Sequence, residues 1–433
     1  MDKKRMKDAV CKVIDQHRDE IIHIGETIRV APELGYKEYK TAAFVESIFE
    51  KMGLDYVNKV ALTGSIARLK GKNSKVKIAV MGELDAVVCP GHPQADPLTG
   101  ASHSCGHFMQ IASMLGTGMA LKYSGVMEEL EGEVVLMATP AEEAVEIEYR
   151  NDLIEKGIIS FIGGKQEMIK LGCFDDIDMA MMCHGVTSNK IEVAETSTGF
   201  IVKYVKYSGK EAHAGAAPHL GVNALNAATL GLQAIAFQRE TFQEKDTIRV
   251  HPIITKGGDL VNVVPSDVRI ETYVRGKTMA GVTDASQKVN RAFRAGAYAM
   301  GADIEIKEIP GYMPRMNNKE MNQFFHANAI AVVGEDNVIN NGHTTGSSDF
   351  GDIMHLMPAI HPYIGGAKGV GHSSNYQVED PEMFYIAPTK IMAMTIIDLL
   401  YDGAAEAQKI IKDFVPIYKN KVEYLKAWEE IAK

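Results

Sequence analysis

The chain has 433 residues, more than a single hydrophobic core usually serves, which suggests two domains. Its net charge is −10 and it contains no basic block, so nucleic acid is not an expected partner. We find no apolar run of the roughly 18 residues that a membrane-spanning helix needs, so no membrane insertion is expected.

The five cysteines are odd in number and widely spaced, which argues against a disulfide framework. Reduced thiols fit a cytoplasmic protein. The N-terminus supports this expectation, because it is charged and leads into an amphipathic pattern rather than an apolar signal core.

Helix-like and strand-like segments alternate along the first part of the chain. Predicted helices cover 6–29, 42–52 and 165–171, and short apolar strands cover 75–81, 132–138 and 177–183. Continuous apolar strands are typical of a parallel sheet that is covered on both faces. The three strands are followed by Asp85, by Glu142 and Glu143, and by His184. Because open α/β sheets carry their sites beyond the carboxyl ends of their strands, we expect these side chains to converge.

The pattern changes near residue 198. Four strands and two helices follow in the order β-α-β-β-α-β, with strands at 199–207, 246–255, 268–274 and 303–309 and helices at 223–240 and 281–300. This order is typical of a ferredoxin-like unit. We expect residues 198–312 to form an inserted α+β domain. Residues 1–197 and 313–433 would then form an α/β domain whose sheet is mostly parallel and flanked by helices.

The α/β pattern of the first part of the chain resumes after the inserted domain. A helix is predicted at 320–333, a strand at 358–364, and two closing helices at 381–402 and 405–430. Glycine- and serine-rich loops lie at 342–351 and 369–375, and the second of them contains His372.

The segment from His103 to His107 places a thiol, Cys105, between two imidazoles at the start of an apolar helical run. A helix N-terminus lowers the pKa of a cysteine, and a thiolate and a neutral imidazole are both good ligands for a divalent metal. The alternative is a small buried cysteine beside a histidine that is satisfied by the fold.

Further candidate ligands follow in Glu142, Glu143, His184 and His372. Several nitrogen, oxygen and sulfur ligands beside one additional carboxylate make up a catalytic metal site, in which the carboxylate takes a proton from water. Taken singly, each residue has a plainer interpretation. The two glutamates could be a solvated acidic pair, His184 a core histidine and His372 a polar loop residue.

Taken together, these segments resemble the metal-dependent aminoacylase and glutamate-carboxypeptidase family of amidohydrolases. The similarity is greatest to the branch of p-aminobenzoyl-glutamate hydrolase and the indole-acetyl-amino-acid hydrolases. It runs through essentially the whole chain and rests on the order and spacing of residues 103–107, 139–143, 183–185, 209–215, 261–265, 347–350 and 371–373.

The resemblance implies a site with two divalent metal ions, for which zinc, manganese and cobalt all suit the ligands. The implied metal ligands are Cys105, His107, Glu143, His184 and His372, with the thiolate of Cys105 bridging the two ions. Glu142 matches the general base and acid.

The inserted domain matches a dimerisation and lid domain, so a homodimer is expected. In relatives the residue at the position of His213 reaches the partner's site and steadies the oxyanion. Asn262 and Arg275 match residues that hold the substrate carbonyl and carboxylate. For these two, the plainer interpretation is that they only complete a strand-turn-strand.

Three functions follow from these patterns. The first is hydrolysis of the amide bond of an N-acyl or N-aroyl amino acid by metal-activated water, with Glu142 as base and acid. The second keeps the metal site but has a more apolar pocket beside Phe108, for a dipeptide or for deamination of an aromatic amine. The third is a non-catalytic binding protein. His343 and His361 are interpreted as structural, and the roles of Glu83 and His219 stay open.

Overall fold

The computed structural model describes residues 1–431, which form two compact units. Unit 1 contains residues 1–196, 316–344 and 352–421, and unit 2 contains residues 197–315, 345–351 and 422–431. The expected division placed 345–351 and the last helix in the α/β domain. The first of these segments groups with unit 2 because Thr198 donates to the carbonyl of Thr345 at 2.8 Å and Arg275 Nη1 lies 3.2 Å from Ser347 Oγ.

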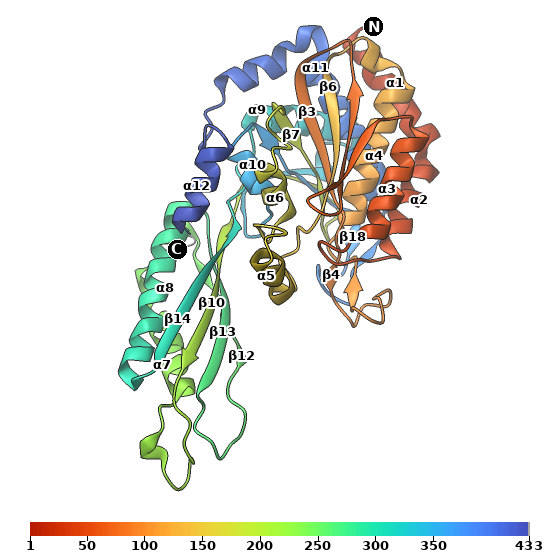
Figure 1. The fold of residues 1–433 in the computed structure, drawn as a ribbon. Helices are drawn as coiled ribbons and strands as arrows, with labels where there is room; N and C mark the ends of the chain where they lie inside the picture. The colour runs from red at the N-terminus through yellow and green to blue at the C-terminus, as the bar shows by residue number, and fades with distance from the viewer. Residues whose placement is uncertain (432–433) are drawn as a thin grey trace. The chain divides into compact units, whose positions relative to one another are not determined.

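Unit 1 is built on a six-stranded sheet with the order β1-β2-β6-β3-β7-β16 (Figure 1). The strands are β1 (Tyr56–Val60), β2 (Gly64–Lys70), β3 (Asn73–Glu83), β6 (Glu131–Thr139), β7 (Met179–Met181) and β16 (Ala359–Ile360). The four strands from β6 to β16 are parallel, whereas β1 and β2 pair antiparallel. This confirms the predicted, mostly parallel sheet and adds an antiparallel edge that the sequence did not reveal.

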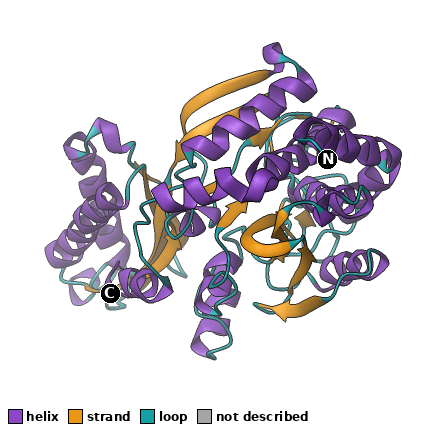
Figure 2. Cartoon of the chain, turned by 90° about the horizontal axis from the view of Figure 1, so that it is seen from above, coloured by secondary structure: helices purple, strands orange, loops and turns teal. Residues whose placement is uncertain are grey.

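Helices cover this sheet (Figure 2). They include α1 (Lys3–Gln16), α2 (Arg18–Arg29), α3 (Tyr39–Lys51), α4 (His107–Tyr123) and α11 (Ala387–Asp413). Every residue of α4 from His107 to Leu121 is buried, so this helix lies inside the core rather than on its surface. The predicted single helix over 6–29 is in fact two helices, because the backbone leaves the helical conformation at His17 (φ −101°, ψ 13°).

The long C-terminal helix α11 is also a core element. A π-helical turn (Glu382–Ile386) precedes it, and the backbone is non-helical from Tyr401 to Ala404, near the predicted helix break. Within residues 1–431, the stretch Glu382–Asp413 is long and apolar enough to cross a membrane by length and composition. However, 89% of its most apolar window is buried inside the protein, as in a core helix.

A second sheet of unit 1 has the order β15-β9-β17-β8. Its strands are β8 (His184–Gly185), β9 (Ile191–Ser197), β15 (Val338–Thr344) and β17 (Tyr363–Ile364). The predicted strand over 358–364 is therefore wrong as one element. It divides at His361 and Pro362 into β16 and β17, which belong to different sheets, and a proline cannot donate the hydrogen bond that a continuous central strand requires.

Shorter elements complete the chain. They are α5 (Ile147–Glu155), α6 (Gly164–Lys170), α9 (Lys319–Val333), α10 (Phe350–Met354), α12 (Lys421–Ile431), β4 (Val87–Val88), β5 (Ala101–Ser102), β18 (Ala367–Lys368) and β19 (Gln377–Val378).

Unit 2 is the predicted ferredoxin-like unit. Its antiparallel sheet has the order β11-β13-β10-β14, and β12 also pairs with β13. The elements are β10 (Gly199–Ser208), α7 (Ala224–Gln238), β11 (Arg249–Val250), β12 (Ile253–Lys256), β13 (Asp267–Gly276), α8 (Met279–Met300) and β14 (Asp303–Tyr312). Helices α7 and α8 pack on the sheet around Val205, Ile270 and Phe293. The predicted strand over 246–255 is interrupted by Pro252.

Candidate metal centre

Cys105 and His107 lie on either side of the residue that directly precedes helix α4. That residue, Gly106, has a φ of 95°, which side chains other than that of glycine rarely adopt. A Cβ atom at this position would lie 2.8 Å from the hydroxyl of Tyr376 and 3.3 Å from Gly185. The glycine therefore allows the backbone to turn sharply in a crowded place, and the turn sets both candidate ligands beside the ends of the central strands.

The ring of His107 is held from one side. Its Nδ1 lies 2.8 Å from the backbone carbonyl oxygen of Asp85 and 3.2 Å from the Asp85 carboxylate. These acceptors fix Nδ1 as the protonated nitrogen and leave Nε2 for a ligand. Nε2 is buried and has no hydrogen-bond partner within residues 1–431, although Glu83 Oε2 lies 3.1 Å from it.

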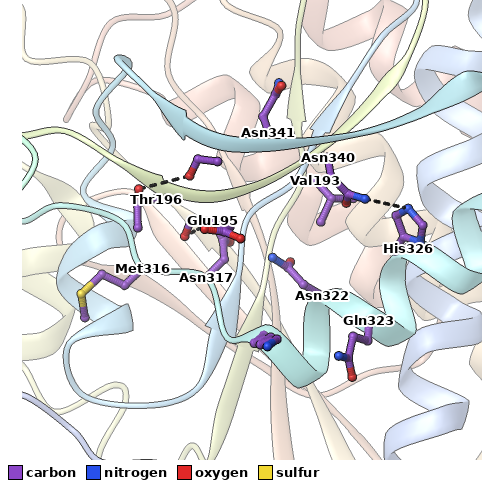
Figure 3. Close-up of a pocket in the computed structure, with 12 residues that line it drawn as sticks. Val193, Glu195, Thr196, Met316, Asn317, Asn322, Gln323, His326, Asn340 and Asn341 are labelled. Atoms are coloured by element: carbon purple, nitrogen blue, oxygen red, sulfur yellow. Dashed lines mark hydrogen bonds between the residues drawn. The ribbon is translucent and has the colours of Figure 1, made fainter.

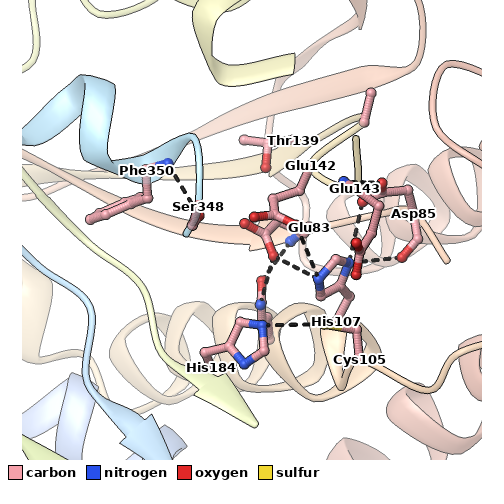
Figure 4. A network of polar contacts seen from close by, with 12 residues as sticks. Glu83, Asp85, Cys105, His107, Thr139, Glu142, Glu143, His184, Ser348 and Phe350 are labelled. Carbon is pink, nitrogen blue, oxygen red and sulfur yellow. Dashed lines mark hydrogen bonds and ion pairs between the residues drawn. The ribbon is translucent and has the colours of Figure 1, made fainter. Parts of the chain in front are cut away.

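Cys105 contacts both of the other candidate histidines, and Figure 4 shows it beside His184. Its Sγ lies 3.5 Å from His184 Nε2 and 3.1 Å from His372 Nε2. His184 Nδ1 lies 2.9 Å from the carbonyl oxygen of Gly185, so its Nε2 also faces the cluster. Burial opposes ionisation of the thiol, but the charges of His107 and His184 outweigh it, and the pKa of Cys105 lies well below its usual range. The thiolate is the form that binds a metal.

Glu142 and Glu143 follow strand β6 in a loop that is fixed from several sides. The buried Glu38 carboxylate accepts from the Ala141 amide at 2.7 Å, and Arg150 donates to the carbonyl of Glu143. Asp85, which holds His107, also accepts from the Glu143 amide at 2.8 Å. One aspartate thus positions two candidate ligands that are far apart in the sequence.

The carboxylate of Glu143 lies 3.1 Å from His372 Nε2. Burial and the nearby Cys105 charge raise the pKa of Glu143 to about 7. Hydrogen bonds to Cys105 and Glu143 raise the pKa of His372 to about 11. Cys105, Glu143 and His372 therefore share protons among themselves, and a bound cation would take the place of those protons.

Two groups of ligand atoms share Cys105, and a third group shares His107. The first contains Cys105, His107 and His184, the second Cys105, Glu143 and His372, and the third Glu83, His107 and Glu142; within each group the ligand atoms lie within 4.8 Å of one another. The five predicted metal ligands are thus brought together, and so is Glu142, whose Oε2 lies 3.8 Å from His107 Nε2.

This donor set fits two divalent ions. A thiolate, imidazoles and carboxylates suit zinc and related metals, and a shared thiolate can join two neighbouring sites. The buried Nε2 of His107 and the buried hydroxyl of Tyr376 have no hydrogen-bond partner in the described part of the chain. Buried polar atoms without partners are costly, so their presence at one point indicates that a ligand completes them.

The three other predicted site residues lie in unit 2. The exposed His213 pairs with Val263 through the backbone, and the amide of Ala214 donates to the carbonyl of Asn262 at 2.9 Å, so His213 and Asn262 are neighbours. Arg275 lies near the end of β13, with its guanidinium 5.0 Å from the ring centre of Phe200. His219 is exposed in the short turn Pro218–Leu220.

Several residues around the centre were not assigned a role from the sequence. Lys165 and Gln110 contact Glu83, and Arg150 and Glu38 hold the glutamate loop. The hydroxyl of Tyr376 is buried without a hydrogen-bond partner among residues 1–431. The backbone carbonyl oxygen of the same residue lies 2.9 Å from His92 Nε2. Lys165 is followed directly by Gln166 and Glu167, so its sequence context does not single it out.

Phe108 has a different place from the one expected. Its ring is fully buried and packs against Phe384 and Tyr385, at centroid distances of 5.7 and 6.1 Å. It therefore faces the core of unit 1 rather than a substrate pocket, which removes the reason for expecting an apolar pocket there.

A separate cavity of about 750 Å³ lies on the second sheet of unit 1 (Figure 3). Its walls combine polar side chains such as Glu195, Asn322 and His326 with the apolar Val193 and Met316. None of its lining residues belongs to the ligand groups, so the chemistry of the chain is not concentrated in this cavity.

A parallel sheet with metal-type ligands at its strand ends, joined to an antiparallel α+β unit, defines the class of two-domain metallohydrolases. Residues 79–396 match Peptidase family M20/M25/M40, and the chain belongs to this family. It is therefore an M20-family metallohydrolase that acts on amide or peptide bonds, as the sequence resemblance implied.

Known relatives agree with this assignment. The chain is 30% identical to the human Xaa-Arg dipeptidase over 92% of this chain and 89% of the relative. It is 25% identical to an IAA-amino acid hydrolase of Arabidopsis thaliana over 80% of this chain and 77% of the relative. A solved Bacillus subtilis structure, described as a dinuclear metal binding peptidase from the M20 family, matches with a TM-score of 0.67 at 20% identity, covering 89% of this chain and 99% of that one.

Proposed function

We propose that this protein hydrolyses the amide bond that joins an acyl group to a C-terminal amino acid, with dipeptides as the first substrate class and N-acyl or N-aroyl amino acids as the second. The similarity to Xaa-Arg dipeptidases supports the first class, and it extends over 92% of the chain. The similarity to an IAA-amino acid hydrolase supports the second. In both classes the leaving group is an amino acid with a free carboxylate.

Glu142 carries the proposed proton transfers. It is buried, it lies 3.8 Å from the metal-facing nitrogen of His107, and it belongs to neither of the ligand groups that share Cys105. This position beside the ligands, rather than among the five of them, is the observation on which the proposal depends. A carboxylate there can take a proton from the attacking water and pass it to the leaving nitrogen, so that the amide becomes a carboxylic acid and an amine.

When bound, two divalent ions supply Lewis acidity and a lowered pKa for water. Cys105, His107, Glu143, His184 and His372 would hold them, and zinc, manganese or cobalt would suit this mixture. Asp85 keeps the proton of His107 on Nδ1 and so keeps the opposite nitrogen available.

The proposed substrate-binding residues are His213, Asn262 and Arg275. The Nδ1 atom of His213 accepts from the amides of Gly215 and Ala216 at 3.2 and 3.1 Å. Its proton therefore resides on Nε2, which makes the ring a donor for a carbonyl or oxyanion oxygen. Arg275 would pair with the substrate carboxylate. In line with the resemblance, we also propose a homodimer that works in the cytoplasm.

The test is a panel of substrates with the zinc-loaded and manganese-loaded protein. It contains dipeptides with basic, acidic and apolar C-terminal residues, N-acetyl and N-benzoyl amino acids, and aromatic amines. Release of a free amino acid supports the proposal, with the preferred class given by kcat/KM. Release of ammonia alone would instead indicate deamination, and turnover of no member would contradict the proposal.

Replacing Glu142 with glutamine tests its role. We expect kcat to fall by about 10²–10⁴-fold while both metals stay bound, because the amide cannot carry the proton. Glu148→Gln is the matched control, since this glutamate is exposed in the next helix. Normal turnover by the Glu142 variant would rule out the proposed base.

A further inference from the structure

Glu83 ends strand β3 in a fully buried position beside the candidate metal centre. Its Oε1 accepts from Lys165 Nζ at 2.5 Å, and the side chains of both residues are completely inaccessible to solvent. Its Oε2 accepts from Gln110 Nε2 at 2.8 Å, and Gln110 Oε1 in turn accepts from the Glu83 amide at 3.0 Å. The carboxylate is thus fixed in one orientation by helices α4 and α6.

In this orientation Oε2 also faces the centre. It lies 3.1 Å from Nε2 of His107, the ring nitrogen that Asp85 leaves available. Two atoms that bind one ion at about 2.1 Å lie roughly 3–3.4 Å apart. Glu83 Oε2 and His107 Nε2 therefore already have the spacing of two ligands of a single ion.

A purely structural role explains the pair poorly. A buried ion pair is seldom better for stability than an apolar pair of the same volume, because both charges lose their hydration. Here the carboxylate also lies against a histidine that belongs to two ligand groups, one with Cys105 and His184 and one with Glu83 itself. A cation at His107 would lie next to Glu83 in either arrangement.

We propose that Glu83 is a further ligand of the ion that Cys105, His107 and His184 hold, and that Lys165 limits how strongly it binds. Lys165 occupies Oε1, so the carboxylate offers one oxygen to the ion and shares its charge with an ammonium group. The ion keeps more of its positive charge as a result. The inference rests on the two-metal site of the proposed function but not on any substrate.

The experiment measures zinc binding rather than turnover. Glu83→Gln, Lys165→Met and the double variant are titrated with zinc in chelator-buffered solutions, and both affinities and the stoichiometry are compared with those of the unchanged protein. Glu83→Gln should weaken one of the two zinc sites by at least the roughly 10- to 100-fold that follows loss of an outer partner. Lys165→Met should strengthen the same site, because both carboxylate oxygens become available.

The double variant guards against misfolding, since it removes both buried charges together. It should lose as much zinc affinity as Glu83→Gln while keeping a cooperative melting transition. The matched control is Lys203→Met, which breaks the buried pair with Glu308 in unit 2. It should lower the melting temperature and leave both zinc affinities unchanged.

Two outcomes would overturn the inference. One is a double variant that binds two zinc ions with the affinities of the unchanged protein. The other is a Lys165→Met variant that binds zinc more weakly, which would make Lys165 a support for the site rather than a limit on it. Neither depends on activity, so a chain that hydrolyses none of the panel could still show the expected zinc affinities.

Discussion

The two units of this protein each bury a lysine paired with a glutamate. The two pairs differ in the other groups that their side chains contact. In unit 2, Lys203 donates to Ser286 and Asn290 at 2.7 Å as well as to Glu308, and Asn290 donates back to Glu308. That network closes on itself. In unit 1, the carboxylate partner of Lys165 faces His107 instead. The same two residue types therefore belong to a closed network in one place and face a candidate ligand in the other.

The comparison shows that burial of charge does not by itself mark a functional site. In unit 2 the neighbouring polar atoms satisfy one another. In unit 1, His107 Nε2 has no hydrogen-bond partner within the described residues, and His107 belongs to two of the groups that could hold an ion. A buried polar atom without a hydrogen-bond partner, in a cluster of possible metal ligands, is a better indicator of a functional site than a buried charge alone.

The largest expected effect comes from removing the residue that two ligand groups share. Cys105→Ala should lose both metal ions and lower activity by more than the roughly 10- to 100-fold that follows loss of an outer partner. Metal content after dialysis and the rate on the best substrate would be measured together. Cys11→Ala, in helix α1, is the control and should keep both ions. Two ions in the Cys105 variant would exclude a bridging thiolate.

A smaller effect is expected from a pair of glycine substitutions, one in each unit. Gly106 and Gly301 both have positive φ, 95° and 70°, so alanine strains the backbone by about 1–2 kcal/mol at either site. Only at Gly106 would the new Cβ meet neighbouring atoms, the nearest being the Tyr376 hydroxyl at 2.8 Å; at Gly301 nothing lies within 4 Å.

We therefore expect Gly106→Ala to reduce zinc affinity as well as stability, because it displaces Cys105 and His107. Gly301→Ala should reduce only the free energy of unfolding. Urea unfolding and zinc titration of both variants separate the two effects. Equal zinc affinities would show that the turn before α4 does not set the ligand geometry.

The smallest expected effect concerns pH. Burial and the charge of Asp85 raise the pKa of Glu38 to about 7, against about 4.5 in the unfolded chain. Between these values the folded protein keeps the proton and the unfolded chain releases it, so this group's contribution to stability is present below pH 4.5 and is lost as the pH rises through 7.

Glu38→Gln should remove that loss. Between pH 5 and 8 the variant should be more stable than the unchanged protein, with a free energy of unfolding that is higher by on the order of 1–3 kcal/mol. Urea unfolding across this range checks the sign, with Glu148→Gln as the control. An identical pH dependence in the two proteins would contradict the raised pKa.

Much of the fold was predictable because its signals are local. Apolar strands and the order β-α-β-β-α-β can be recognised from neighbouring residues alone, and both were found. Strands β1 and β2 were missed because neither is a continuous apolar run: β1 has Asn58 and Lys59 inside it, and β2 has Arg68 between Ala67 and Leu69. The break at His17 was missed because the apolar period continues through it.

The site was predictable to a similar extent. The candidate ligands were found from residue type and position after strands, and the structure brings Cys105, His107, Glu142, Glu143, His184 and His372 together. Their support was not found. The contacts of Asp85 and Lys165 with this centre join segments that are far apart in the chain, and no local pattern encodes them.

The sequence alone thus determined which chemistry is present: a thiol, imidazoles and carboxylates placed after apolar strands, and a second unit of known type. Tertiary structure decided how these groups are held. Packing between distant segments decides whether Phe108 lines a pocket or fills the core. It also decides which side chains the Glu83 carboxylate contacts, here a lysine and the metal-facing nitrogen of a histidine. Such packing is a property of the whole core, because it is set by shape and burial rather than by the identity of neighbouring residues.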